Sequence, residues 1–234
     1  MDLTNKVAIV TGGSNGIGKE IARTLAECGS KVFITGRNAD RLQNAAEELG
    51  VTGIVSDASK EEDVKKVFGQ VMETEGKLDI LINNAGFGAG WGELGDLSME
   101  DMRRVYDTNV FGATMMGQEA AKIFRDQKSG NIVNIGSTAS VKGYAKGSIY
   151  ASSKFALRGL SQCWQGDLRP YNVRVMHVNP SEVTTAFGKT DGLSRDEVSN
   201  KLRPKEIADV VISQLKMDER GFVPEVTVWA TNPW

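Results

Sequence analysis

The sequence is poor in the side chains that most often bind metals or act as general bases. A single histidine, His177, stands among 234 residues, which excludes zinc sites built from a histidine pair and clusters that need several histidines. The two cysteines, Cys28 and Cys163, lie far apart and fit no C-x-x-C spacing. Two isolated thiols are typical of packing residues in a reducing compartment, and they exclude a disulfide scaffold.

Long apolar runs and an excess of one charge are also missing. No apolar stretch approaches the ~18 residues of a membrane span, and the amino terminus lacks a secretory signal pattern. Lys and Arg number 28 against 30 Asp and Glu, without a basic block that would attract nucleic acid or an anionic membrane. We therefore expect a cytoplasmic protein with neither a nucleic-acid nor a membrane partner.

Glycine, in contrast, is abundant, with 26 residues and no G-x-y repeat, as expected for a fold with many tight turns. Hydrophobic residues make up 40% of the chain and charged residues 25%, so the chain should bury enough apolar surface to fold unaided. No linker, repeat or low-complexity tract divides it. We expect one catalytic domain, 1–234, with a substrate loop inserted at approximately 181–203.

Short β-branched runs alternate with amphipathic stretches along the whole chain. The predicted strands are Val7–Val10, Lys31–Thr35, Thr52–Ser56, Leu78–Ile82, Asn131–Ile135, Val173–Val178 and Phe222–Trp229. Apolar residues at helical spacing predict helices near 17–29, 42–49, 64–72, 99–125 and 149–168, and Pro204 is a possible helix start. Ser194-x-x-Glu197 has the spacing of a capping box. The predicted fold is an α/β three-layer sandwich with a doubly wound, mainly parallel seven-stranded sheet.

A glycine-rich turn falls between the first strand and the first helix, with the sequence Thr11-Gly12-Gly13-Ser14-Asn15-Gly16-Ile17-Gly18. Its G-x-x-x-G-x-G spacing allows a tight turn, a close approach of backbone to a pyrophosphate, and close helix packing. The helix amino terminus would then face the phosphates. The predicted dinucleotide contacts are Gly12, Ser14, Asn15, Gly16, Ile17 and Gly18, and a plain structural turn is the alternative.

The end of the second strand indicates which dinucleotide binds. NAD needs a carboxylate there for its ribose hydroxyls, but the chain reads Thr35-Gly36-Arg37. The planar donors of Arg37 match a 2′-phosphate, with help from the Ser14 hydroxyl and possible help from Asn38. NADP(H) is therefore predicted over NAD(H), although Arg37 as an ordinary solvated charge is the alternative.

Four further segments follow in order: Asn83-Asn84-Ala85-Gly86, Asn109, Ser137 and Tyr150-x-x-x-Lys154. Together with the glycine turn, they closely resemble the short-chain dehydrogenase/reductase family, from about Val7 to at least Thr185. The resemblance implies a Rossmann-like domain, a nicotinamide cofactor, interconversion of carbonyl and alcohol groups, and a homotetramer or homodimer.

The same resemblance implies roles for individual positions. Asp57 and Ala58 would contact the adenine. The wall of the cofactor cleft would be Asn84, Ala85 and Gly86, and the nicotinamide loop would contain Pro180, Val183 and Thr185. One departure stands out, because the family usually has Pro-Gly where this chain has Pro180-Ser181. Serine should make that turn stiffer than glycine would.

Reduction of a ketone leaves an alkoxide that needs a proton, and Tyr150 is the candidate donor. Lys154 lies four residues along the same helix, hence on the same face, and a nearby cation lowers the pKa of a phenol. His177 lies in an apolar strand and is expected to be a packed, hydrogen-bonded residue. By resemblance, Lys154 also binds the nicotinamide ribose, Asn109 supports a water-linked proton path, and Ser137 donates a hydrogen bond to the substrate carbonyl.

The expected function is an NADPH-dependent carbonyl reductase, reversible as an alcohol dehydrogenase, acting on a ketone, an aldehyde or a 3-oxoacyl-type compound. Candidates for an apolar substrate wall are Phe87, Trp91, Tyr144 and Phe187, each of which could equally be packing. Glu182 is a candidate for recognition of a polar substrate or a solvated loop charge. The alternatives are a catalytically silent NADPH-binding regulatory or scaffold protein, and a Rossmann-like methyltransferase, which has no use for Tyr150-x-x-x-Lys154.

Overall fold

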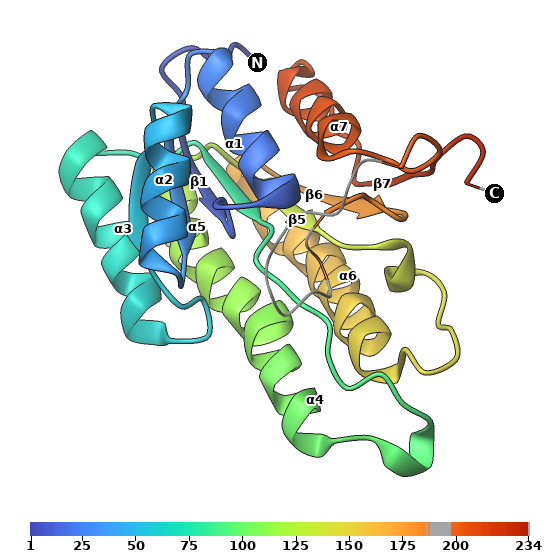
Figure 1. Ribbon diagram of the computed structural model, residues 1–234. Helices are drawn as coiled ribbons and strands as arrows, with labels where there is room; N and C mark the ends of the chain where they lie inside the picture. Colours follow the sequence, from blue (N-terminus) through green and yellow to red (C-terminus); the bar gives the residue numbers. More distant parts are fainter. Residues whose placement is uncertain (186, 188–197, 234) are drawn as a thin grey trace.

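The computed structural model describes residues 1–185, 187 and 198–233, and these form a sheet covered by helices on both faces (Figure 1). The seven described strands run parallel in the order β3-β2-β1-β4-β5-β6-β7. They are β1 (Val7–Thr11), β2 (Lys31–Gly36), β3 (Thr52–Val55), β4 (Ile80–Asn83), β5 (Gly130–Ile135), β6 (Val173–Pro180) and β7 (Glu225–Val228). The predicted three-layer α/β fold is confirmed.

The helices come from the amphipathic stretches. They are α1 (Gly16–Glu27), α2 (Ala39–Leu49), α3 (Glu61–Glu75), α4 (Met99–Tyr106), α5 (Ala113–Gln127), α6 (Ser148–Leu168) and α7 (Pro204–Lys216). Single turns are η1 (Leu94–Asp96), η2 (Asp107–Gly112), η3 (Thr138–Ser140) and η4 (Arg169–Tyr171). The helix predicted near 99–125 is interrupted, because the π-helical turn η2 separates α4 from α5.

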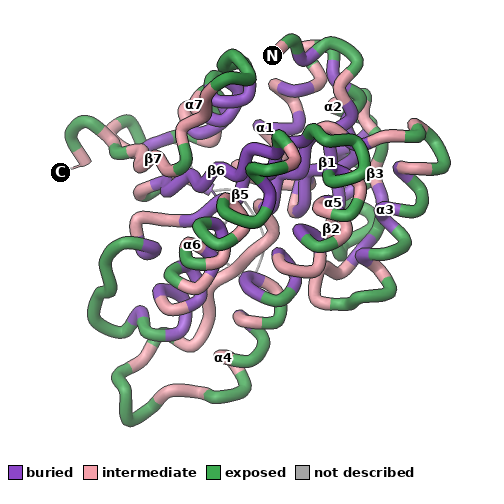
Figure 2. The backbone as a smooth tube through the Cα atoms, turned by 180° about the vertical axis from the view of Figure 1, so that it is seen from behind, coloured by how far each residue is buried: buried purple, intermediate pink, exposed green. Residues whose placement is uncertain are grey.

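Two apolar cores lie on opposite faces of the sheet. Buried residues of α1, α2 and α7 pack on one face, and those of α3, α5 and α6 pack on the other. Alternate residues of β1 follow this division, since Ala8 and Val10 belong to the first core while Val7 and Ile9 belong to the second. Every residue of β1 is buried, which explains its unbroken apolar pattern. Figure 2 shows the same buried strands in the middle of the molecule.

Two strands begin later than the sequence pattern predicts. Leu78 precedes β4 because its backbone bonds to a side chain: the Gln127 amide accepts from Leu78 N at 3.2 Å and donates to Leu78 O at 2.7 Å. Just before the edge strand β7, Pro224 has no N–H to donate, and the strand begins at Glu225. The hydrophobic pattern of the sequence does not predict these effects of a side-chain hydrogen bond and of a proline.

The carboxyl-terminal third contains the predicted substrate loop. Pro204 begins α7, as predicted, and the Glu206 carboxylate accepts a hydrogen bond from Arg203 N at 2.7 Å. Ser194 and Glu197, with most of the loop, lie outside the described residues. In the described ranges, no helix combines the length and the apolar character needed to cross a membrane.

His177 is buried in the middle of β6 and is hydrogen-bonded, as predicted. Its Nδ1 lies 3.0 Å from Ser161 Oγ, and its Nε2 lies 3.4 Å from Ser140 Oγ. Because the Ser161 hydroxyl donates to Leu157 O at 2.7 Å, these bonds assign the proton to Nδ1 of a neutral ring. Burial, with a smaller contribution from the Lys154 charge, lowers the pKa of His177 to about 4.

The lowered pKa of His177 predicts that this residue destabilises the folded protein at low pH, and that its contribution is absent in His177→Gln. The unfolded chain, with a histidine pKa of ~6.5, binds more protons than the folded chain between pH 6.5 and 4, so stability is lost as the pH falls through that window. The slope approaches ~1.4 kcal/mol per pH unit. Urea unfolding at pH 6.5 and 4.5 should show a smaller loss in His177→Gln than in the wild type. Carboxylates titrate in both proteins, so equal losses would contradict the assignment.

Candidate active site

The predicted glycine turn lies at the carboxyl end of β1 and has the backbone that the cofactor hypothesis requires. Gly12 and Gly16 have φ values of 63° and 55°, in the left-handed region that side chains disfavour. A Cβ on Gly18 would lie 2.3 Å from Asn84 Nδ2 and 2.5 Å from Gly12 O. The turn therefore admits no larger residue at Gly18 without displacing the Asn84 side chain and the Gly12 carbonyl.

Thr11 and Asn84 hold this turn against the loop that follows β4. The Asn84 amide donates to Thr11 O at 2.9 Å and to Gly12 O at 3.2 Å. In return, Thr11 Oγ1 accepts from Asn84 N and Ala85 N, both at 2.9 Å. Thr11 stands in the glycine motif but was not predicted as a site residue, because its role depends on Asn84, which lies 73 positions later in the sequence.

The amino terminus of α1 points out of the turn and is suited to an anion. Asn15 caps the helix, with its side chain accepting from Gly16 N at 2.7 Å. Ile17 and Gly18 follow in a first turn that contains no acidic residue, so the positive end of the helix dipole is left uncompensated. The predicted nicotinamide loop closes over the turn, because a Cβ on Gly16 would lie 3.3 Å from Thr185 Cγ2.

Arg37 lies beside this turn, at the end of β2. A Cβ on Gly36 would lie 3.3 Å from Ser14 Oγ, so the Ser14 hydroxyl is next to the strand end, as predicted. The Arg37 guanidinium lies 5.9 Å from the centre of the Phe87 ring, and Arg104 lies 5.8 Å from the same ring. The side-chain oxygen of Asn38, a possible further contact to the 2′-phosphate, instead caps α2 by accepting a hydrogen bond from Arg41 N at 2.8 Å.

Asp57 and Ala58, the predicted adenine contacts, follow β3 and so end at the same edge of the sheet. The Asp57 carboxylate accepts from Ser59 N at 3.0 Å and from Ser59 Oγ at 2.8 Å, which fixes the turn. Ala58 O would lie 2.7 Å from a Cβ on Gly112, so this turn packs tightly against η2.

Ser137, Tyr150 and Lys154 meet where β5 ends and α6 begins. A hydrogen bond joins Ser137 to the Tyr150 phenol, and Lys154 Nζ lies 5.9 Å from the centre of the Tyr150 ring. Lys154 also donates to Ile135 O at 2.8 Å, which fixes the ammonium below the strand end. The helical spacing of Tyr150 and Lys154 therefore places both side chains at one point, as predicted.

The pKa of Tyr150 differs in direction from the expectation. Burial raises it to about 12, and the Ser137 hydrogen bond lowers it by less. Burial also lowers the pKa of Lys154 to about 8, which weakens the cation that was expected to favour the phenolate. In the chain without cofactor, the expectation of a lowered Tyr150 pKa is therefore wrong, and the Tyr150 phenol is protonated at pH 7.

Asn109 joins this group from η2, the π-helical turn. Its side chain is buried, accepts from Phe87 N at 3.0 Å and donates to Phe87 O at 2.9 Å and Ser153 Oγ at 3.1 Å. A Cβ on Gly86 would lie 3.0 Å from Asn109 Oδ1 and 3.6 Å from Lys154 Nζ. The extra residue of a π turn turns a side chain to a new direction, and here it brings Asn109 against the loop that follows β4.

The backbone of Ser137 is held by two residues that the sequence did not single out. Ser137 N donates to Ser140 Oγ at 3.1 Å and to Asn179 Oδ1 at 3.3 Å. Asn179 donates in turn to Glu225, which pairs with Arg158. The spacing Ser137-x-x-Ser140 could have indicated the first contact, but the second joins two strands and has no local signal.

The unexpected Ser181 now has a structural explanation. Its N–H donates to Val228 O at 2.8 Å, and its hydroxyl accepts from Ala230 N at 3.3 Å, so it anchors the segment that follows β7. Glu182 pairs with Lys201 at 2.8 Å, and Val183 bridges to Leu202. These contacts fix the segment that contains Pro180, Val183 and Thr185. Within that segment, Glu182 forms an ion pair.

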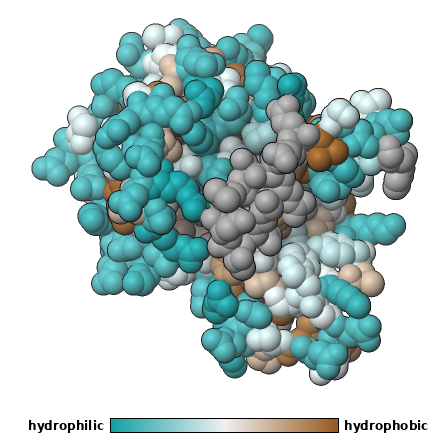
Figure 3. Space-filling model, in the orientation of Figure 1, coloured by the Kyte–Doolittle hydropathy of each residue, from teal (hydrophilic) through white to brown (hydrophobic). Residues whose placement is uncertain are grey.

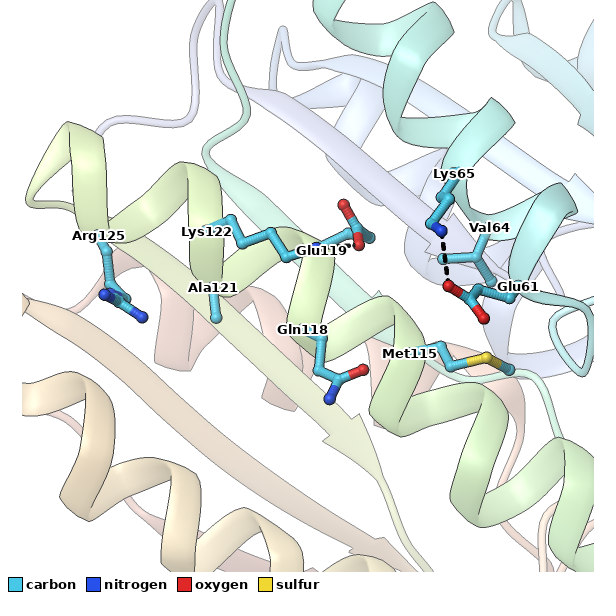
Figure 4. Close-up of a pocket in the computed structure, with 9 residues that line it drawn as sticks. All are labelled: Glu61, Val64, Lys65, Met115, Gln118, Glu119, Ala121, Lys122 and Arg125. Carbon is cyan, nitrogen blue, oxygen red and sulfur yellow. Dashed lines mark hydrogen bonds and ion pairs between the residues drawn. The ribbon is translucent and has the colours of Figure 1, made fainter.

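A pocket lies between α3 and α5 (Figure 4). Its charged side chains form the pairs Glu61–Lys65 at 2.6 Å and Glu119–Lys122 at 2.5 Å. Glu61 and Lys65 are both exposed, and exposed pairs of this kind contribute little to stability. The pocket holds none of the predicted site residues.

Known proteins match both the sequence and the fold. The sequence model of the family "short chain dehydrogenase" matches residues 6–195. An uncharacterized oxidoreductase of Staphylococcus aureus (strain MRSA252) is 33% identical over 229 residues, covering 97% of both chains.

Two solved structures show the same arrangement. An alcohol dehydrogenase from the archaeon Thermococcus sibiricus, complexed with 5-hydroxy-NADP, has a TM-score of 0.88, 31% identity and 97% coverage of both chains. A serine dehydrogenase complexed with NADP+ also has a TM-score of 0.88, with 28% identity and coverage of 95% of this chain and 94% of that one. With its seven-stranded parallel sheet and these matches over nearly its whole length, the chain belongs to the short-chain dehydrogenase/reductase family of oxidoreductases.

Proposed function

We propose that the protein is an NADP(H)-dependent carbonyl reductase that also runs in reverse as an alcohol dehydrogenase. The observation that carries this proposal is the meeting of Ser137, Tyr150 and Lys154 at one sheet edge, with a Ser137–Tyr150 hydrogen bond and Lys154 Nζ 5.9 Å from the Tyr150 ring centre. A protein that only binds the cofactor has no need of this set.

The described residues fit a dinucleotide phosphate. Gly12, Gly16 and Gly18 leave backbone and the amino terminus of α1 open toward a pyrophosphate. Arg37 and Ser14 lie together at the end of β2, where a 2′-phosphate would be held. When bound, the nicotinamide supplies or accepts the hydride. The two complexes with NADP-type cofactors among the similar structures support the same choice.

Tyr150 is the proposed proton donor for reduction. Its raised pKa, about 12, keeps the phenol protonated at neutral pH, as a general acid requires. The O–H bond of Tyr150 breaks as the proton moves to the carbonyl oxygen, whose carbon receives the hydride and its electron pair. Ser137 donates a hydrogen bond to the same oxygen, and that bond strengthens as negative charge develops.

Lys154 stabilises the phenolate that remains after proton transfer. Its ammonium is buried, fixed by Ile135 O at 2.8 Å and close to the Tyr150 ring. A fixed cation in a site with little water interacts more strongly with a new anion than a solvated cation does. Asn109, held by Phe87 and Ser153, keeps the neighbouring backbone in place for a water-linked proton path.

Replacing Arg37 by Asp tests the cofactor assignment. The change removes charge-assisted bonds to a 2′-phosphate and offers a carboxylate to ribose hydroxyls, so the ratio of kcat/KM for NADPH over NADH should fall at least ~10-fold. Steady-state kinetics with both cofactors measures the ratio. Arg125→Asp, a matched charge reversal on α5, should leave it unchanged. An unaltered ratio in Arg37→Asp would refute the assignment.

Replacing Tyr150 by Phe tests the proton donor. The ring remains but the hydroxyl is lost, so kcat for carbonyl reduction should fall by ~100-fold or more, while the Kd for NADPH stays within a few-fold. Stopped-flow turnover and NADPH fluorescence titration measure the two quantities. Tyr171→Phe, which removes a hydroxyl far from the site, should keep wild-type turnover. Retained turnover in Tyr150→Phe would eliminate Tyr150 as the donor.

A further inference from the structure

Aromatic rings surround the Tyr150 phenol. The Trp91 ring centre lies 5.9 Å from that of Tyr150 and 6.4 Å from that of Tyr144, and Phe187 lies 5.2 Å from Tyr150. We call these four residues the aromatic cluster. The planes of Trp91 and Phe187 are tilted by 55° and 59° to Tyr150, within the geometry that aromatic pairs prefer.

Three rings of the cluster, all except that of Tyr150, come from loops, and these three rings are exposed to solvent. Trp91 follows β4, Tyr144 follows η3, and Phe187 follows β6. Trp91 and Tyr144 are each 49% exposed and Phe187 39%, whereas Tyr150 is 9% exposed. Figure 3 shows pale and brown atoms gathered on the lower lobe, whereas teal dominates the upper part. A monomer seldom presents several large rings together unless they meet a ligand or partner.

The loop backbone is shaped to receive these particular rings. A Cβ on Gly88 would lie 2.6 Å from Trp91 Cζ2, and a Cβ on Gly147 would lie 2.3 Å from Tyr144 Cε2. Any side chain at either glycine would displace the ring. Gly92 N donates to Lys146 O at 3.3 Å, which joins the Trp91 loop to the Tyr144 loop. The rings of Trp91 and Tyr144 therefore pack closely against the glycine backbone of two loops that are hydrogen-bonded to each other.

Two ion pairs lie on the loops that carry the cluster and on the segment that follows β6. Glu93 and Lys146, on the same two loops, lie 3.8 Å apart, and Glu182 pairs with Lys201 at 2.8 Å. A carboxylate packed against the ring faces would lose water and gain no hydrogen bond from those faces, which is costly. A flat neutral group would instead bury the exposed ring faces and gain stacking contacts.

We propose that the aromatic cluster selects neutral carbonyl compounds with an aryl group next to the carbonyl, with Trp91 as the main specificity-determining residue. This proposal rests on the proposed reductase function, because it places the aryl group beside the Tyr150 hydroxyl. The ring of such a substrate packs against Trp91, Tyr144 and Phe187 while its carbonyl oxygen faces Ser137 and Tyr150.

Three methyl ketones test this selection: acetophenone, 2-butanone and 4-acetylbenzoate. With the wild type and NADPH, kcat/KM should be at least ~10-fold higher for acetophenone than for its carboxylate analogue. In Trp91→Leu, the ratio of kcat/KM for acetophenone to kcat/KM for 2-butanone should fall ~10-fold relative to the wild type. The intrinsic reactivity of the two ketones is the same with both proteins, so it does not affect this comparison. Trp91→Phe should retain most of the wild-type ratio of acetophenone to 2-butanone. The control Trp229→Leu, which makes the same change at an exposed tryptophan, should leave that ratio unchanged. An unchanged ratio in Trp91→Leu, or equal use of 4-acetylbenzoate, would overturn the selection.

A binding experiment separates failure of this proposal from failure of the reductase function. Benzamide carries an aryl group and a carbonyl that is not reduced, and its binding to NADP+-saturated protein is measured by calorimetry beside acetamide. Benzamide should bind the wild type at least ~10-fold more tightly than it binds Trp91→Leu, and acetamide should show no such difference. Absence of turnover with every ketone would refute the reductase, while equal benzamide affinity in both proteins would refute aryl selection.

Discussion

All seven described strands run in the same direction, so the loop that follows each strand is delivered to one edge of the sheet. The glycine turn after β1, Arg37 after β2, Asn84 after β4, Ser137 after β5 and Thr185 after β6 meet there for that reason. Burial of both faces by helices makes this arrangement rigid. Function then depends on short contacts between loops, such as those between Asn84 and Thr11, that hold the edge in one shape.

Burial at this edge has two opposing electrostatic effects. It raises the pKa of Tyr150 and lowers that of Lys154, so burial shifts each group toward its neutral form. The Tyr150 phenol is thereby kept protonated, while the Lys154 ammonium beside it is costly to keep charged. The Ser137 hydrogen bond and the fixed position of Lys154 at Ile135 O offset part of that cost. The rings of Trp91 and Phe187 lie against Tyr150 and contribute to its burial.

Much of this architecture could be predicted from periodicity and spacing. The alternation of strands and helices, the glycine turn, and the pair Tyr150 and Lys154 are local patterns, and the structure places them as predicted. The π turn at Asn109, the Asn179 contact to Ser137 and the Ser181 contact to Ala230 join distant segments, and nothing in the local sequence reports them. The pKa of Tyr150 differs from the prediction because spacing reveals a neighbouring charge but not the desolvation caused by burial.

We propose that this edge of the sheet binds NADPH and promotes hydride transfer to a carbonyl carbon. The most direct measurement uses NADPH deuterated at C4 of the nicotinamide, acetophenone and 2-butanone as acceptors, and mass spectrometry of the alcohols. Deuterium from one of the two C4 positions should appear on the carbinol carbon of the product. Tight NADPH binding without deuterium in any alcohol product would contradict the account and leave a protein that binds the cofactor without using it.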